Sequence, residues 1–174
     1  VQLLKQREEV LQGIMPELQA MIDTSEVKPG VRIYEGTDGL KLVYEDILDT
    51  LKTENIKILY ATAHPEIFKF LPKYFPDWLE RRAAAGIQTQ LIMPAESAKD
   101  NVFQEGQNRE IKYLPVDYPF QCSMDIYADK IAFFSFKGNK VYSIVVESAT
   151  IANLWKQFFR FVWNSLPKIA PLNK

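Results

Sequence analysis

Two apolar stretches decide the fold: Ile-Lys-Ile-Leu-Tyr-Ala-Thr at 56–62 and Ile-Gln-Thr-Gln-Leu-Ile-Met at 87–93. Each has the length and the apolar content of a strand. The residues between them are typical of a helix, which Pro72 and Pro76 divide into two pieces, the second at 77–85. Because a strand–helix–strand unit needs a right-handed crossover, this region predicts two parallel strands in an α/β protein.

The residues before this unit predict one more strand and one more helix. Residues 31–34 alternate between apolar and polar side chains, as a half-buried strand does. Asp38 is expected to cap the helix that follows, whose apolar residues at 40, 43, 47 and 51 share one face.

The second half of the chain has several strand signals separated by short turns. We expect four strands there, at 111–114, 123–127, 130–136 and 140–146. Tight turns between them favour antiparallel pairing in this half. Ser148 is expected to cap a last helix that runs to about Leu166. The chain is therefore predicted to form an α/β fold with a mixed sheet flanked by helices.

Length and composition narrow the class of protein. The 174 residues are 47% hydrophobic, with 21 basic and 22 acidic side chains, which excludes a disordered tail and a collagenous repeat. A net charge of −1 gives this chain no electrostatic attraction to nucleic acid or anionic lipid. A single cysteine fits a reducing compartment, and no apolar run is long enough for a membrane span. We expect a cytoplasmic protein with no membrane partner.

The first residues predict a separate helix. Leu4, Leu11 and Leu18 recur at every seventh position, which is the spacing of a coiled-coil seam. We expect residues 1–26 to form a linker and dimerisation helix, and residues 27–174 to form one domain. The alternative is an amphipathic helix that packs on its own domain.

The last predicted helix is apolar over most of its circumference. Beside one stripe for the core, it carries a second stripe with Trp155, Phe159 and Trp163. A helix with two apolar stripes needs a cover on both sides. We expect these aromatic side chains to anchor the interface of a homodimer, because aromatic residues are typical of interface cores. Burial of the whole helix within the domain is the alternative.

Few side chains suggest chemistry. His64, the only histidine, follows a predicted parallel strand, and open α/β sheets bind ligands beyond the carboxyl ends of their strands. A purely structural imidazole is the competing interpretation. For Cys122, which lies in an apolar strand, an inert buried thiol is expected in preference to a dyad with His64. No zinc ligand set and no glycine-rich phosphate loop is recognisable.

Predicted strand ends supply a set of candidate ligand-binding residues. They are Glu35, Gly36, His64, Asp125 and Ser135. Nothing among them amounts to a catalytic constellation, so the sequence predicts a binding protein that is not an enzyme and has no cofactor and no metal.

Four segments form a recognisable series along the chain. They are Val-Arg-Ile-Tyr-Glu-Gly at 31–36, Arg-Arg-Ala-Ala-Ala-Gly-Ile at 81–87, Asp-Ile-Tyr-Ala-Asp-Lys-Ile-Ala-Phe at 125–133, and Ile-Val-Val-Glu-Ser at 144–148 leading to Leu-Trp-Lys-Gln-Phe-Phe at 154–159 and to Trp163. In their order and spacing, over about 29–166, they resemble the effector domain of TrmB-like transcriptional regulators.

The resemblance implies a fold similar to half of a phospholipase D, paired with a second copy. Phospholipase D chemistry needs a histidine nucleophile, a lysine two positions later and an aspartate five beyond that. Counted from His64, the last two positions hold Glu66 and Leu71. Matched on the strand at 130–135, the histidine and lysine positions fall near Gln121 and Ser123. The resemblance thus implies this fold without its catalytic motif.

The family also implies partners. Its members have a winged-helix DNA-binding domain before the linking helix, so we expect DNA contact through a domain upstream of Val1. The effector would be a sugar or another small metabolite that binds one arrangement of the dimer more tightly than another. Two alternatives stay open: a phospholipase D-like phosphodiesterase with a displaced or degenerate site, and a ligand-free dimerisation scaffold.

Overall fold

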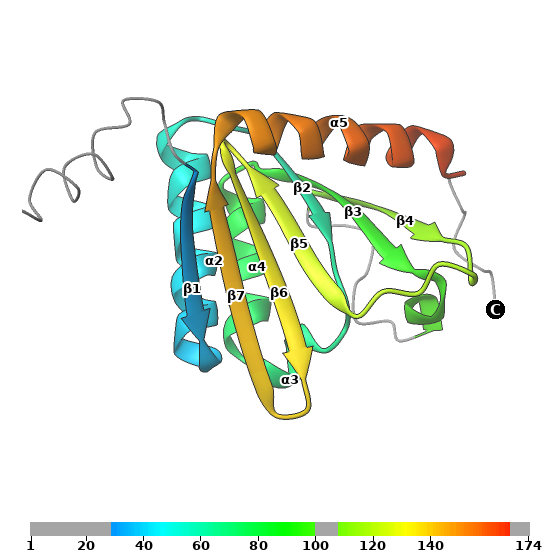
Figure 1. Ribbon diagram of the computed structural model, residues 1–174, viewed down its shortest axis with the longest axis horizontal. Coiled ribbons are helices and arrows are strands. Elements are labelled where there is room, and N and C mark those ends of the chain that lie inside the picture. The colour runs from blue at the N-terminus through cyan, green and yellow to red at the C-terminus, as the bar shows by residue number, and fades with distance from the viewer. Residues whose placement is uncertain (1–28, 100–107, 168–174) are drawn as a thin grey trace, which may run out of the picture.

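The computed structural model describes residues 29–99 and 108–167 (Figure 1). The helix predicted at 1–26, with Leu4, Leu11 and Leu18, lies outside the described residues. The elements in chain order are β1 (Gly30–Glu35), α2 (Gly36–Thr53), β2 (Ile58–Thr62), α3 (Ile67–Phe70), α4 (Tyr74–Ala84), β3 (Gln88–Pro94), the 3₁₀ turn η1 (Ala95–Lys99), β4 (Arg109–Leu114), β5 (Cys122–Tyr127), β6 (Lys130–Lys137), β7 (Lys140–Glu147) and α5 (Ala149–Ser165).

The predicted strand–helix–strand unit is present, and its strands are parallel. Ile58 of β2 lies opposite Gln88 of β3. Two helical pieces connect the strands, as expected, but α4 begins at Tyr74 instead of residue 77. Pro76 therefore falls in the first turn of α4, where its missing N–H removes no intrahelical hydrogen bond.

The seven strands form one mixed sheet in the order β1-β7-β6-β5-β2-β3-β4. The hairpins β5–β6 and β6–β7 are antiparallel, which confirms the prediction. β4, which we expected in the antiparallel half, is instead parallel to β3, with Thr89 opposite Arg109. The connection at 95–108 is long enough to return to the starting edge of the sheet, whereas a tight turn allows only an antiparallel neighbour.

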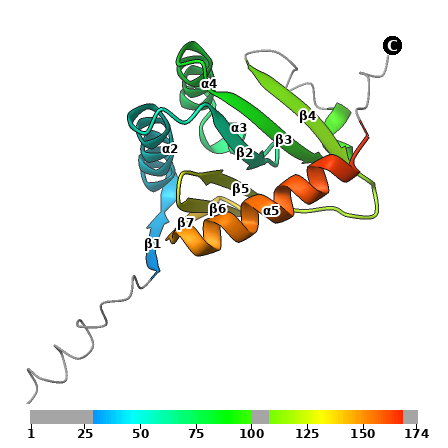
Figure 2. The same ribbon diagram turned by 90° about the horizontal axis from the view of Figure 1, so that it is seen from above.

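Helices cover the two faces of the sheet unequally (Figure 2). α2, α3 and α4 lie on one face, and α5 lies alone on the other. We call these the three-helix face and the α5 face. The core under the three-helix face includes Leu40, Trp78 and Phe134, all buried, and the indole Nε1 of Trp78 donates to the carbonyl of Tyr44 at 2.7 Å. The core under α5 is smaller and includes Ile126 and other residues of β5 and β6.

Helix starts agree with the sequence in one case and differ in the other. Ser148 caps α5 as predicted, because its Oγ accepts a hydrogen bond from the N–H of Ile151 at 3.4 Å. Asp38 does not cap α2, which follows β1 directly and begins at Gly36. Gly36 has a φ of +75°, a conformation that glycine adopts freely and that turns the chain from strand into helix. Asp38 lies in the first turn and pairs with Lys41.

The inward side of α5 differs from the prediction. Phe159 and Trp163 are buried in the chain's own core with Ile126 and Ile131, so they cannot anchor a subunit interface. Their spacing from the buried Ala152 places all three on one side of the helix. Of the three predicted anchors, Trp155 alone reaches the surface.

A buried lysine fixes the end of α5. The Nζ of Lys112 on β4 donates to the carbonyls of Trp163 and Leu166, at 2.7 and 2.9 Å, and lies 4.8 Å from the Trp163 ring centroid. A cation is favoured at the negative end of a helix. No helix within residues 29–99 and 108–167 is long and apolar enough to cross a membrane.

Candidate functional site

A hollow of about 550 Å³ lies beyond the carboxyl ends of β2 and β3. The residues that line it come from two loops: His64, Pro65, Glu66, Phe68 and Lys69 after β2, and Glu96 and Ser97 after β3. Ligands of open α/β sheets bind at this edge of the sheet. The hollow is therefore the leading candidate for a ligand site, and it contains the predicted His64.

Hydrogen bonds orient His64 within this hollow. Its backbone N–H donates to Oγ of Ser123 at 3.0 Å, and its ring Nδ1 accepts from the backbone N–H of Glu66 at 3.4 Å. Because Nδ1 accepts, the neutral ring carries its proton on Nε2. Lys69 pairs with Glu66 at 3.3 Å, and Ser97 adds a hydroxyl. These groups suit a small, oxygen-rich molecule.

Two other predicted residues, Glu35 and Ser135, belong to a row across four neighbouring strands on the α5 face. Tyr142 lies opposite both Glu35 and Ser135, and Ser135 lies opposite Cys122. Gly36 follows Glu35 directly. Cys122 is exposed, contrary to the buried thiol that we expected. It begins β5, at the end of the strands that lies far from α5 (Figure 1).

Asp125 lies on the opposite face from this row. It is 5% exposed and pairs in register with Ala61 and Ala132, both part of the core under the three-helix face. It borders a small cavity of about 30 Å³, which has room for one or two water molecules. Burial raises the pKa of Asp125 to about 8, and the nearby charge of Arg82 opposes that shift.

Arg82 is fully buried beside the same cavity. Its guanidinium donates to the carbonyl of Ile87, and to that of Asn108 at 3.3 Å. Burial lowers the pKa of Arg82 to about 10, with a smaller contribution from the charge of Arg109. Arg82 therefore ties the end of α4 to the starts of β3 and β4, which is a structural task.

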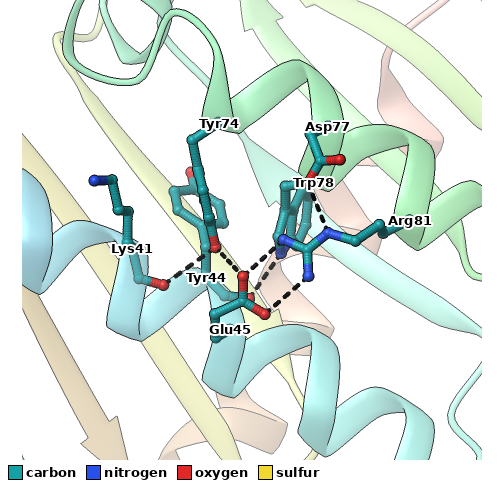
Figure 3. A network of polar contacts seen from close by, with 7 residues as sticks. All are labelled: Lys41, Tyr44, Glu45, Tyr74, Asp77, Trp78 and Arg81. Carbon is teal, nitrogen blue, oxygen red and sulfur yellow. Dashed lines mark hydrogen bonds and ion pairs between the residues drawn. The ribbon is translucent and has the colours of Figure 1, made fainter.

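A polar network joins α2 and α4 at the rim of the three-helix face (Figure 3). Arg81 holds Glu45 with two hydrogen bonds, at 2.6 and 3.0 Å, and Tyr74 donates to the same carboxylate. The hydrogen bond from Arg81 is the main reason that the pKa of Glu45 falls to about 2. Burial and the Glu45 carboxylate raise the pKa of Tyr74 well above its usual value. These groups satisfy one another, so the network is a clamp between helices.

The five predicted ligand residues are thus divided among three places: the hollow, the row on the α5 face, and the internal cavity. Alternation along β5 and β6 separates Asp125 from Ser135, because their side chains leave opposite faces of the sheet. Within residues 29–99 and 108–167, no group of three or more His, Cys, Asp or Glu side chains is placed to hold a metal ion.

The positions at which the resemblance would place the catalytic histidine and lysine are occupied by residues of other types. Ser123, near the expected lysine position, is 2% exposed and accepts the backbone N–H of His64. Gln121, near the expected histidine position, lies exposed just before β5. Ser123 therefore braces the loop after β2.

The fold is shared with solved structures. A structure of TrmBL2, an archaeal chromatin protein with a novel mode of DNA binding, matches 95% of this chain and 64% of its own, with 16% identity and a TM-score of 0.53. Nuc from Salmonella typhimurium, a phospholipase D family member, matches 82% of this chain and 99% of its own, with 13% identity and a TM-score of 0.58. No protein-family model and no curated protein matches the sequence. The chain has the phospholipase D-like fold and spans 64% of the length of TrmBL2.

The sequence did not point to two residues of the hollow or to two residues of the row on the α5 face, for different reasons. Glu96 and Ser97 follow the strand at 87–93, so the rule that selected His64 would have selected them as well. Tyr142 and Cys122 carried no local signal, because their place beside Ser135 depends on the register of three strands.

Proposed function

We propose that this chain is the effector and dimerisation domain of a TrmB-like transcriptional regulator, with DNA contacted by a domain outside this chain. The observation that carries the proposal is the likeness to TrmBL2, a chromatin protein that binds DNA, over 95% of this chain. The net charge of −1 supports the division of labour, because contact with DNA phosphates needs an excess of Lys and Arg.

The hollow at the carboxyl ends of β2 and β3 is the proposed effector site. Its imidazole, hydroxyl and carboxylate groups, beside the Lys69 ammonium that pairs with Glu66, suit a sugar or another small metabolite whose hydroxyls both donate and accept hydrogen bonds. An effector changes DNA binding only if it binds one dimer arrangement more tightly than another. The loops after β2 and β3 would transmit that preference to the sheet.

The proposal includes the absence of phosphodiester hydrolysis. Catalysis of the phospholipase D kind needs a nucleophilic imidazole with a lysine partner. His64 has Glu66 two positions later, and its Nδ1 already accepts a hydrogen bond. The second candidate function, a phosphodiesterase with a displaced site, is favoured by the TM-score of 0.58 with Nuc.

A thermal-shift screen with sugars, nucleotides and organic acids tests the effector site. We expect one class to raise Tm with ligand concentration, because a ligand that binds only the folded state stabilises it. His64→Gln keeps the backbone N–H that Ser123 accepts and should weaken this shift, whereas Cys122→Ser, outside the hollow, should not. Silence from every class would favour the ligand-free scaffold.

An assay with a generic phosphodiester separates the two candidate functions. We expect the wild type to give no turnover above the protein-free rate. Turnover that disappears in His64→Ala would contradict the proposal and support the phosphodiesterase.

A further inference from the structure

The sheet is left open on the α5 face beside the helix. Ile33 of β1 lies opposite Ile144 of β7, which lies opposite Phe133 of β6, and Val31 lies opposite Val146. Val31 and Ile33 are 58% and 66% exposed. Two apolar rows of these three strands therefore face outward.

α5 continues this apolar surface along its outward side. Leu154, Trp155, Phe158 and Phe161 share one side of the helix and are 55%, 39%, 56% and 72% exposed. The ring centroids of Trp155 and Phe133 are 6.0 Å apart, and those of Trp155 and Phe158 are 6.3 Å apart. Because Phe133 also neighbours Ile144, the strands and the helix form one continuous surface. We call it the open face, after its six exposed members: Val31, Ile33, Leu154, Trp155, Phe158 and Phe161.

The open face is as large as the largest apolar patches of typical monomers and approaches the size of a protein interface. Large apolar side chains have roughly 150–200 Å² each, so the exposed fractions of the six members give roughly 600 Å². This is the upper end of the largest patch on a typical monomer, about 300–600 Å². It approaches the ~800 Å² that each partner contributes to an interface of standard size.

The lack of charge on the open face favours a protein partner over a nucleic acid or an anionic membrane. Its six members are uncharged, and α5 has only two charged side chains, Lys156 and Arg160. Lys156 donates to the carbonyl of Ala128. A nucleic acid or an anionic membrane calls for a surface rich in Lys and Arg. In a two-fold interface, each patch contacts the same patch of the other copy. An uncharged apolar patch can pair in this way because no like charges are brought together.

We propose that the open face is the surface through which two copies of this chain pair, with the α5 helices and the exposed strands β1 and β7 of each copy in contact. The inference rests on the dimer that the proposed function assumes, and it assigns that dimer a surface. The row Glu35–Tyr142–Ser135–Cys122 borders the apolar rows and forms the polar rim, as is usual around an apolar interface core.

Light scattering and sedimentation of three proteins at micromolar concentration test the surface. The variants are Phe158→Glu on the open face and Leu42→Glu, a control on α2 whose side chain is 61% exposed on the other side of the sheet. Both side chains are exposed, so both variants should keep the wild-type circular dichroism spectrum. We expect dimers for the wild type and for Leu42→Glu, and at least a 100-fold weaker dimer for Phe158→Glu, because a two-fold axis brings two charges into the interface.

The outcomes separate this inference from the proposed function. If Phe158→Glu is as dimeric as the wild type, the open face is not the dimer interface, but the dimer itself stands. A monomeric wild type would overturn both the surface and the dimer, and the thermal-shift screen would still decide the effector site. A single spin label on Cys122, the only cysteine, gives a further check, since a two-fold pair yields one intersubunit distance that Phe158→Glu should abolish.

Discussion

The two faces of the sheet are built differently. Three helices cover one face, where Tyr44 stacks on Phe134 with 5.0 Å between ring centroids and contacts Phe75 and Trp78. One helix lies on the other. Seven strands at ~4.8 Å spacing span about 29 Å, whereas a helix with its side chains is about 10–12 Å wide. A single helix therefore leaves part of that face uncovered, and the apolar side chains there form the open face through which we propose that two copies pair.

The faces also differ in the ionisable groups that they bury. The three-helix face buries Asp125 and Arg82 beside a small cavity and closes its rim with the Glu45–Arg81 clamp. The α5 face buries one cation, Lys112, on helix carbonyls and is otherwise apolar at its open part. The three-helix face therefore has its polar groups paired within the chain, whereas the open part of the α5 face leaves apolar side chains exposed.

The largest expected effect separates Trp78, a tryptophan under the three-helix face, from Trp155, a tryptophan of the open face. Trp78→Ala should lower the free energy of unfolding by about 4 kcal/mol, because it leaves a cavity and removes the hydrogen bond from the indole to the carbonyl of Tyr44. Trp155→Ala, half-exposed, should cost less than ~1 kcal/mol when urea unfolding is followed at a concentration where the chain is monomeric. Equal losses would mean that the two faces do not differ as described.

A second test uses the proton on Asp125. The folded carboxyl holds its proton up to about pH 8, whereas the unfolded one releases it near its ordinary pKa of 3.8. Between these values the unfolded state binds fewer protons, so the free energy of unfolding falls as pH rises. We expect a fall of about 2.5 kcal/mol from pH 5 to pH 7 in urea titrations. Asp125→Asn should remove this slope and the exposed Asp49→Asn should retain it; a flat wild type would refute the assignment.

The smallest expected effect concerns the clamp between Glu45 and Arg81 at the rim of the three-helix face. Glu45→Gln should cost about 1 kcal/mol at pH 7, because the ion pair with Arg81 is more than a third exposed and solvent screens it. The pKa of Glu45 is lowered to about 2 from 4.5, so its contribution is present above pH 4.5 and is lost as pH falls toward 2. Urea unfolding at pH 7 and pH 2.5 measures it, with Asp38→Asn as control for an exposed pair. A deficit of the same size at both pH values would speak against the clamp.

Local signals succeeded for one strand pair and for one of the two predicted helix caps; the other cap, Asp38, failed because the turn at Gly36 starts α2 two residues earlier. The parallel pair β2–β3 follows from a strand–helix–strand pattern, and the cap at Ser148 follows from one hydroxyl before an apolar helix. Local signals also failed to predict the direction of a strand pair that depends on segments far apart in the sequence. β4 has the sequence of any short strand, and its parallel pairing with β3 depends on the connection before it.

The site shows the same division. His64 could be selected because a parallel strand has a defined carboxyl end. Grouping it with Asp125 and Ser135 was wrong, because the pleat of β5 and the register with β6 send those side chains to opposite faces.

By itself, the sequence determined the alternation of strands and helices, the two apolar stripes of the last helix and the absence of a histidine–lysine pair, since these depend on residue type and spacing along the chain. Only the tertiary structure decided that Phe159 and Trp163 point inward while Phe158 and Phe161 point outward, that Cys122 is exposed, and that β1 and β7 extend the apolar surface of α5. A helix with two apolar stripes is consistent with either orientation, and the packing of α5 on β5 and β6 chose between them.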